Sequence, residues 1–169
     1  PRGGLWKWTG TDFDTLPGSH LFGSTMIIYD MAVYQGELYL CGSWSGLSNI
    51  AKWNGSTFSS VSHLFPSVVS ALEVYQGELY AGGPDDDHGG IMRWNGSQWS
   101  TVGTGLATGA NIYDFVVYGA ELYAIGSLST VSGNSIGIAR WDGATWKDVG
   151  PGGANGPVST IGVHNGEIY

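Results

Sequence analysis

The amino-acid sequence predicts an all-β protein built from repeated antiparallel hairpins. Glycine accounts for 29 of the 169 residues, aromatic residues make up 13% and charged residues only 12%. This composition is typical of many short strands joined by tight turns, whereas disorder requires low hydrophobicity and high charge. Two short sequence phrases also alternate along the chain, and each occurs four times. These copies are the main evidence for the fold class.

The first phrase predicts a tight hairpin with a two-residue turn. It reads YQGELY at 34–39 and 75–80, YGAELY at 118–123 and HNGEIY at 164–169, and it recurs every 41 to 46 residues. The residues around the turn are apolar at successive positions, as in ALEVYQGELYAGG at 71–83. Strands that are apolar on both faces must be covered on both faces. We therefore expect this hairpin to supply the inner strands of each repeat.

The second phrase predicts another hairpin, which carries paired aromatic residues. Its copies are LWKWTGTDF (5–13), IAKWNGSTF (50–58), IMRWNGSQW (91–99) and IARWDGATW (138–146). Asn-Gly and Asp-Gly favour a two-residue type I′ turn. With that turn, Trp53 would face Ser56 and Ala51 would face Phe58 across the hairpin. Because side chains two residues apart share a face, Trp53 and Phe58 are expected on the same face.

Four strands in each repeat of 41 to 47 residues, with the inner strands covered on both faces, are typical of a β-propeller blade. The repeats span about 26–67, 68–111 and 112–157, and a fourth would combine 158–169 with 1–25. The predicted fold is a single four-blade propeller domain over 1–169, whose N-terminal outer hairpin and C-terminal inner hairpin close the last blade. Closure would remove exposed sheet edges. A ring completed by a second copy and a piece of a longer array are the alternatives.

The repeats resemble Kelch-type propeller repeats, as in the central propeller of galactose oxidase. The residues that carry the resemblance are ELYLCG (37–42), ELYAGG (78–83) and ELYAIG (121–126), each followed by a tryptophan hairpin. Two of these three copies lack the first glycine of the Kelch Gly-Gly pair. The chain is similar to divergent Kelch-like arrays of bacterial surface proteins and fungal cortical polarity markers. The resemblance implies inner strands from the first phrase, outer strands from the second, and an extracellular or cell-surface location, bacterial for the first of these groups.

Composition also bears on partners. The net charge is −8 and no basic run occurs, which argues against nucleic-acid binding. No apolar run approaches the roughly 18 residues that a membrane-spanning helix needs. The single cysteine, Cys41, lies in an apolar strand pattern, and we expect it to be a buried, inert thiol.

One acidic segment is a candidate metal site. The run PDDDHGG at 84–90 contains three carboxylates and a histidine, which are hard ligands suited to Ca²⁺ or another divalent cation. Their spacing does not match a calcium-binding loop, so a solvated acidic loop is the favoured interpretation and a weakly bound divalent cation is the alternative. No other cofactor is predicted. The candidate ligands are Asp85, Asp86, Asp87 and His88.

Asp30 and Asp114 occupy equivalent positions of two repeats. Alignment of the inner strands places Tyr29-Asp30-Met31 over Tyr113-Asp114-Phe115, whereas the intervening copies carry small residues there. In a four-fold ring, the two carboxylates would face each other across the channel and form a cation or ligand site at its mouth. The favoured alternative is that each Asp accepts backbone N–H groups of a neighbouring repeat.

Trp44 does not belong to the repeat. It lies in GSWSGLSN (42–49), a predicted loop, and an exposed loop aromatic residue could stack on a sugar or on a partner protein. The repeated glutamates are instead expected to be exposed structural positions next to the turns, because repeats duplicate structural needs. These are Glu37, Glu78, Glu121 and Glu167.

The predicted function is non-catalytic binding of a protein or glycan by variable loops on a rigid scaffold. The loops that differ most between repeats are 42–49, 84–90, 126–137 and 150–157. No nucleophile elbow, P-loop, dinucleotide-binding fingerprint or metalloprotease motif occurs, and the ligand motifs of the copper oxidases within the Kelch group are not recognisable. The alternatives are a carbohydrate-binding propeller that uses Trp44, and a fragment of a larger propeller enzyme with its site at the channel mouth.

Overall fold

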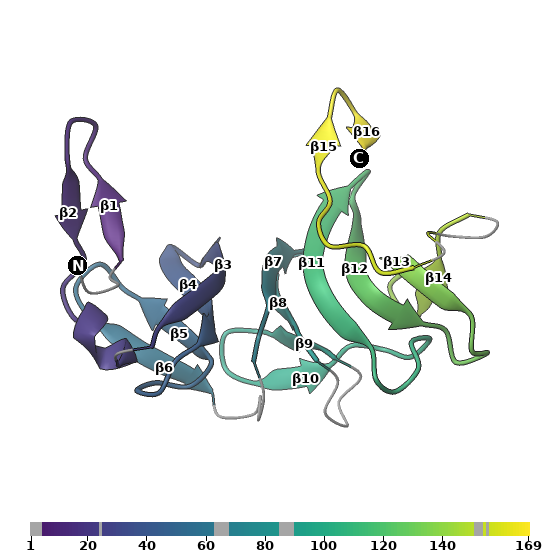
Figure 1. Ribbon diagram of the computed structural model, residues 1–169, viewed down its shortest axis with the longest axis horizontal. Coiled ribbons are helices and arrows are strands. Elements are labelled where there is room, and N and C mark those ends of the chain that lie inside the picture. Colours follow the sequence, from purple (N-terminus) through teal and green to yellow (C-terminus); the bar gives the residue numbers. More distant parts are fainter. Residues whose placement is uncertain (1–4, 24, 63–67, 85–89, 151–153, 155) are drawn as a thin grey trace. The chain divides into compact units, whose positions relative to one another are not determined.

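A computed structural model describes residues 5–23, 25–62, 68–84, 90–150, 154 and 156–169 (Figure 1). The structure is all-β, with one short 3₁₀ helix, η1 (Ser19–Phe22). It divides into two compact units, Pro1–Val69 (unit 1) and Ser70–Tyr169 (unit 2).

Unit 1 contains a two-stranded and a four-stranded antiparallel sheet. The first pairs β1 (Trp6–Trp8) with β2 (Phe13–Thr15). The second is a meander in which each strand pairs with the next along the chain. Its strands are β3 (Ile27–Tyr34), β4 (Glu37–Ser43), β5 (Ile50–Trp53) and β6 (Phe58–Ser62).

Unit 2 contains two further four-stranded meanders and a terminal hairpin. The first meander comprises β7 (Ala71–Tyr75), β8 (Glu78–Gly82), β9 (Ile91–Trp94) and β10 (Trp99–Thr101). The second comprises β11 (Asn111–Tyr118), β12 (Glu121–Ser129), β13 (Ser135–Trp141) and β14 (Trp146–Asp148). The hairpin pairs β15 (Val163–His164) with β16 (Glu167–Ile168), drawn in yellow in Figure 1.

The predicted hairpins are present in the predicted order. In every four-stranded sheet the first phrase forms strands one and two, and the tryptophan phrase forms strands three and four. The first and last hairpins of the described chain each form a two-stranded sheet of their own. The all-β fold is therefore confirmed, and no closed ring is present among the described residues.

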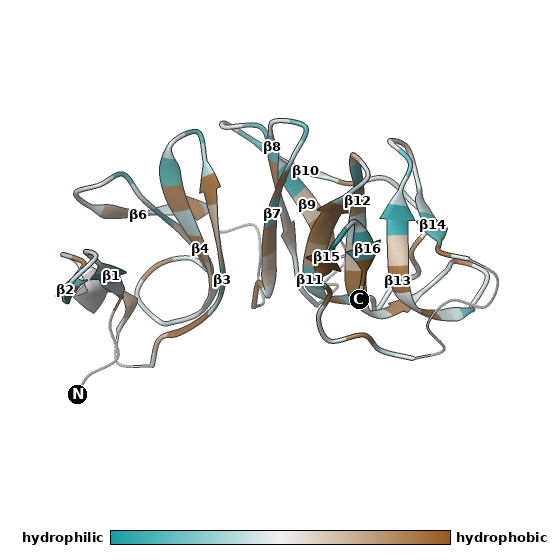
Figure 2. Cartoon of the chain, turned by 90° about the horizontal axis from the view of Figure 1, so that it is seen from above, coloured by the Kyte–Doolittle hydropathy of each residue, from teal (hydrophilic) through white to brown (hydrophobic). Residues whose placement is uncertain are grey.

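The inner hairpins have the predicted two-residue turns. Gln35 and Gly36 both have positive φ, at 51° and 80°, as a type I′ turn requires. The same holds at the three other inner turns, Gln76-Gly77, Gly119-Ala120 and Asn165-Gly166. In the four-stranded sheets, the strands that leave these turns are buried on both faces, as at Leu79–Gly82 of β8. Figure 2 shows apolar residues running along β11 and β12, which form the equivalent hairpin of the next sheet.

The outer hairpins have wider turns than predicted. Trp53 pairs with Phe58, and Ala51 pairs with Ser60, so the predicted pairing across a two-residue turn is wrong. The side-chain oxygen of Asn54 accepts the backbone N–H groups of the residues two and three positions later, at 2.9 Å each, and this bonding closes a four-residue loop. The predicted shared face is confirmed, because the Trp53 and Phe58 rings lie opposite each other with centroids 4.6 Å apart.

In two of the four-stranded sheets, the second glycine of the Gly-Gly position is required for a steric reason. A Cβ on Gly42 would collide with the Ile27 carbonyl oxygen, and one on Gly126 would collide with that of Asn111. These carbonyls belong to the start of the neighbouring inner strand. The first position of the pair does not require glycine in every sheet. It is occupied by Cys41, Gly82 and Ile125 in the three sheets. This difference explains why the second position stays glycine where the first position is Cys41 or Ile125.

Candidate functional site

Trp44 is part of the hydrophobic core of unit 1. Its side chain is 8% exposed, and its ring packs edge-on against Phe22 of η1 at 4.9 Å between centroids. The indole N–H donates to the Ser48 carbonyl at 2.7 Å. Stacking on a sugar or a partner requires an exposed ring, so the buried Trp44 is not available for the predicted binding role.

Asp30 and Asp114 both lie at β-bulges of equivalent inner strands. The register shifts between Ile28 and Asp30, and between Ile112 and Asp114. Each carboxylate accepts the N–H of the residue that follows it, at 2.7 Å and 2.8 Å. Asp114 also accepts the backbone N–H of Ile161 at 3.3 Å, from the segment that leads to β15. This contact corresponds to the alternative in which the Asp holds the neighbouring repeat.

The predicted metal ligands and the predicted variable loop 126–137 do not add residues to a site in the described part of the chain. Asp85, Asp86, Asp87 and His88 lie outside the described residues. Within the described ranges, no group of three or more potential metal-ligating side chains comes together. Much of the predicted loop 126–137 is strand, because β12 reaches Ser129 and β13 starts at Ser135.

Cys41 is fully buried, as the sequence predicts. Its burial, with a smaller contribution from the negative charge of Asp30, raises the pKa of the thiol well above its ordinary range. The thiol form therefore persists at neutral pH, and this cysteine is a poor nucleophile and metal ligand.

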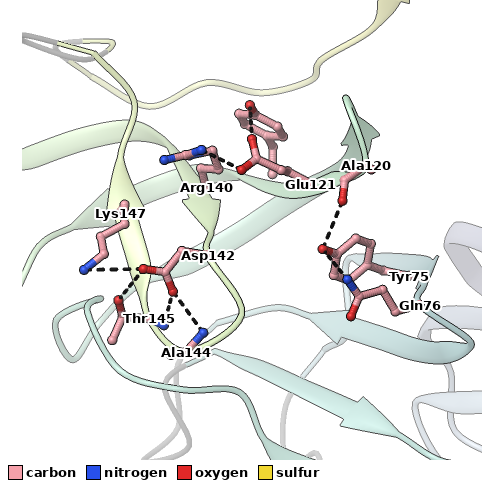
Figure 3. Close-up of polar contacts among 10 residues, drawn as sticks. Tyr75, Gln76, Ala120, Glu121, Arg140, Asp142, Ala144, Thr145 and Lys147 are labelled. Atoms are coloured by element: carbon pink, nitrogen blue, oxygen red, sulfur yellow. Dashed lines mark hydrogen bonds and ion pairs between the residues drawn. The ribbon is translucent and has the colours of Figure 1, made fainter.

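The repeated glutamates form a repeated ion pair, which sequence reasoning did not predict. In each four-stranded sheet, the glutamate after the inner turn contacts a basic residue on the third strand (Figure 3 shows one). The hydrogen bond from Arg140 lowers the pKa of Glu121, and that from Lys52 to Glu37 raises the pKa of Lys52. The pairs are Glu37–Lys52 at 2.7 Å, Glu78–Arg93 at 3.0 Å and Glu121–Arg140 at 2.6 Å.

A second repeated contact links consecutive inner hairpins of unit 2. The Tyr75 hydroxyl donates to the carbonyl of Ala120 at 3.2 Å, and the Tyr118 hydroxyl donates to that of Gly166 at 2.7 Å. Both tyrosines precede their own turn, and both acceptors are the second residue of the next turn along the chain. Each inner hairpin of this unit is therefore tied to its successor by the same hydrogen bond (Figure 3 shows that of Tyr75).

The segment after an outer hairpin covers the tryptophans of the next sheet. In unit 2, Val102 accepts the indole N–H of Trp146 at 3.3 Å, and Gly103 lies directly against the Trp141 ring. Trp141 is consequently only 7% exposed. Unit 1 begins with the same arrangement. The N–H of Leu16 donates to the carbonyl of Leu5, just as the N–H of Val102 donates to the carbonyl of Ile91. The next residue is then Pro17 in place of the glycine.

A groove lies at this position in unit 1. Its volume is about 450 Å³, and Trp53, the equivalent of Trp141, is half-buried at its side. The charged and hydroxyl groups at the groove come from the first hairpin, and the segment after β2 supplies apolar carbon. The lining residues include Lys7, Asp14, Thr15, Leu16, Pro17 and Trp53. An aromatic ring beside a carboxylate, an ammonium and a hydroxyl is suited to a small polyhydroxylated ligand.

Sequence reasoning missed this groove because Trp53 is shared by every repeat. The available signal was Pro17, which stands where another repeat has Gly103. A proline lacks the backbone N–H and the small size that let the glycine lie against the ring. The groove is therefore a departure from the repeat, which is where a specific function would be expected.

No protein-family model matches the chain, and no curated protein matches it significantly. None of the helices in the described part of the chain is long and apolar enough to cross a membrane.

Proposed function

We propose that this chain is a non-catalytic binding module with a Kelch-like, four-blade propeller scaffold. The support is the residue-by-residue equivalence of the sheets: three are complete meanders, and the two terminal hairpins correspond to the outer half and the inner half of a fourth. The outer half exposes aromatic residues that complete sheets cover. Phe13 is 58% exposed, whereas its equivalents Phe58, Trp99 and Trp146 are 6%, 9% and 4% exposed.

The observation that carries the binding function is the groove beside Trp53. It departs from the repeat, it is open, and its lining combines the aromatic side chain of Trp53 with the opposite charges of Lys7 and Asp14. Sugars present apolar C–H faces to aromatic rings and hydroxyls to charged groups. The favoured ligand class is therefore a neutral glycan, bound here and not at Trp44.

A glycan array followed by NMR titration tests this function. We expect a glycan of millimolar or better affinity to shift the indole N–H resonance of Trp53, and Asp14→Asn to weaken binding several-fold because a charged hydrogen-bond acceptor is lost. Trp94→Phe is the matched control, since Trp94 is the equivalent half-buried residue of the next sheet along the chain. The proposal fails if no glycan perturbs Trp53, or if Trp94→Phe weakens binding as much as Trp53→Phe.

A further inference from the structure

We propose that the Asn54-Gly55 pair is a self-modifying site that reshapes the groove beside Trp53. At this site the side-chain amide of Asn54 is lost as ammonia without an enzyme, and the residue becomes aspartate or isoaspartate. Both residues of the pair are exposed to water, and Gly55 lines the groove. The inference rests on the proposed glycan binding for its effect on function, whereas the modification itself does not depend on that binding.

The reaction takes place within the chain. Hydroxide removes the proton of the Gly55 N–H, and the backbone nitrogen attacks Cγ of Asn54, so that a C–N bond forms and the carbonyl electron pair moves to Oδ1. The intermediate then collapses, the bond from Cγ to Nδ2 breaks, and the nitrogen takes a proton from water and leaves as ammonia. Water opens the resulting five-membered imide. Attack of water at Cγ gives aspartate, and attack at the main-chain carbonyl carbon gives isoaspartate.

The outer turn of unit 1 arranges the reacting atoms for the first step. Oδ1 of Asn54 accepts the N–H groups of Ser56 and Thr57 at 2.9 Å each. The ring closed by the Ser56 hydrogen bond passes through the Gly55 nitrogen, and Cγ is therefore held close to that nitrogen. The same two N–H groups point at the oxygen on which negative charge develops. Donors placed in this way lower the barrier to such a step.

Glycine at position 55 leaves the attacking nitrogen accessible. Gly55 has φ of +95°, and no atom lies within 4 Å of the place that a Cβ would take. Within the described residues, its N–H donates no hydrogen bond. The nitrogen is therefore available as a nucleophile once its proton is removed.

The two products differ in what they do to the turn. Asp142 occupies the equivalent position between β13 and β14, and its carboxylate accepts the N–H groups of Ala144 and Thr145 at 2.9 Å and 2.7 Å. Aspartate at position 54 is therefore compatible with the closed turn and adds only a negative charge. Isoaspartate instead makes the Cγ carbonyl part of the main chain and lengthens the chain by one methylene group. The four-residue loop then loses its hydrogen bonds, and Gly55 moves.

The next sheet along the chain provides a matched control. Oδ1 of Asn95 accepts the N–H groups of Ser97 and Gln98 at 2.9 Å each, in the same pattern as at Asn54. This turn belongs to unit 2, whereas the groove is lined by residues of unit 1. The Ser97 hydroxyl also donates to the same oxygen, at 2.9 Å. Asn95 therefore has one more donor than Asn54, and we expect it to react faster and to leave the groove unchanged.

Peptide mapping by mass spectrometry tests the modification. After incubation of the whole chain in mildly alkaline buffer, Asn54 and Asn95 should each gain one mass unit, with isoaspartate identified by electron-transfer fragmentation. Ser97→Ala should slow the conversion of Asn95 about two- to tenfold, the range for one hydrogen bond, and leave that of Asn54 unaffected. An unchanged rate in this variant would refute the role of the donors. An Asn54 that stays intact in the folded chain, while the urea-unfolded chain is converted, would overturn the inference.

NMR of the modified forms tests the effect on the groove. These forms carry one extra negative charge and are separated from the natural chain by anion exchange. We expect the indole N–H resonance of Trp53 to shift when isoaspartate is at position 54, and to stay in place when it is at position 95. Asn54→Asp supplies the charge without the methylene group and should shift this resonance clearly less. An unmoved Trp53 resonance in the form with isoaspartate at 54 would rule out any effect on the groove.

Glycan titration separates this inference from the proposed function. The neutral glycan selected on the array should bind the form with isoaspartate at 54 several-fold more weakly, because the side of the groove at Gly55 has moved, and should bind the form modified at 95 normally. If no glycan binds the natural chain, the binding function is refuted and the mass and NMR results stand. If the natural and isoaspartate forms bind equally well, the effect of the modification on binding is refuted and the binding function stands.

Discussion

Asp142 shows how a single residue closes an outer turn. Its carboxylate accepts the N–H groups of Ala144 and Thr145 at 2.9 Å and 2.7 Å, and Lys147 lies 3.5 Å away (Figure 3). These backbone hydrogen bonds lower its pKa from 3.8 to about 2. Asn54 and Asn95 make the same contacts without a titratable group. Among the outer turns that Asn54, Asn95 and Asp142 close, the turn of Asp142 is therefore the one expected to be sensitive to acid.

Acid titration checks this expectation. Because the pKa of Asp142 is lowered on folding, its stabilising contribution is complete above pH 3.8 and is lost as the pH falls through about 2. The amide resonances of Ala144 and Thr145 should therefore shift with a midpoint near pH 2. Asp142→Asn should keep the hydrogen bonds and abolish this titration. A midpoint near 4 in the natural chain would show that the carboxylate is not held by these donors.

At the scale of elements, the sequence predicted the inner hairpins best. Their turns use backbone conformations that Gln-Gly and Asn-Gly tolerate, and apolar residues on both faces specify burial directly. The outer turns were predicted too short because Asn54 closes its loop through its side chain, which the Asn-Gly pair alone does not reveal. Trp44 was misjudged since its burial depends on Phe22, a residue 22 positions earlier, in η1. Tertiary contacts of this kind leave no periodic signal.

The covering of the β13–β14 hairpin by the segment after β10 makes an element-scale prediction. Gly103→Ala should destabilise the protein by about 2 to 4 kcal/mol, because Gly103 has φ of +58° and a Cβ there would overlap the Trp141 ring. Gly109→Ala is the control, with φ of +86° and open space around the Cβ, and should cost about 1 kcal/mol. Urea denaturation measures both. Equal losses would mean that close packing against Trp141 contributes nothing.

At the scale of the molecule, the account depends on the two terminal hairpins joining into one blade. The repeats predict that these hairpins correspond to the outer and inner halves of a blade, because one carries the tryptophan phrase and the other the GEIY phrase. Pairing between the two terminal hairpins could not be derived from local sequence patterns, since it depends on strands that are far apart in the chain. The groove was also beyond prediction, as it results from how Leu16 and Pro17 pack beside Trp53.

Small-angle X-ray scattering tests this central claim most directly, since it yields both mass and dimensions. A ring closed within one chain predicts a scattering mass of 17.9 kDa and a radius of gyration of about 15 Å, the value for a compact domain of this length. A monomer with a clearly larger radius would show that the terminal hairpins stay apart. A mass of about twice that of one chain would show that a second copy completes the ring, and either result would contradict closure within one chain.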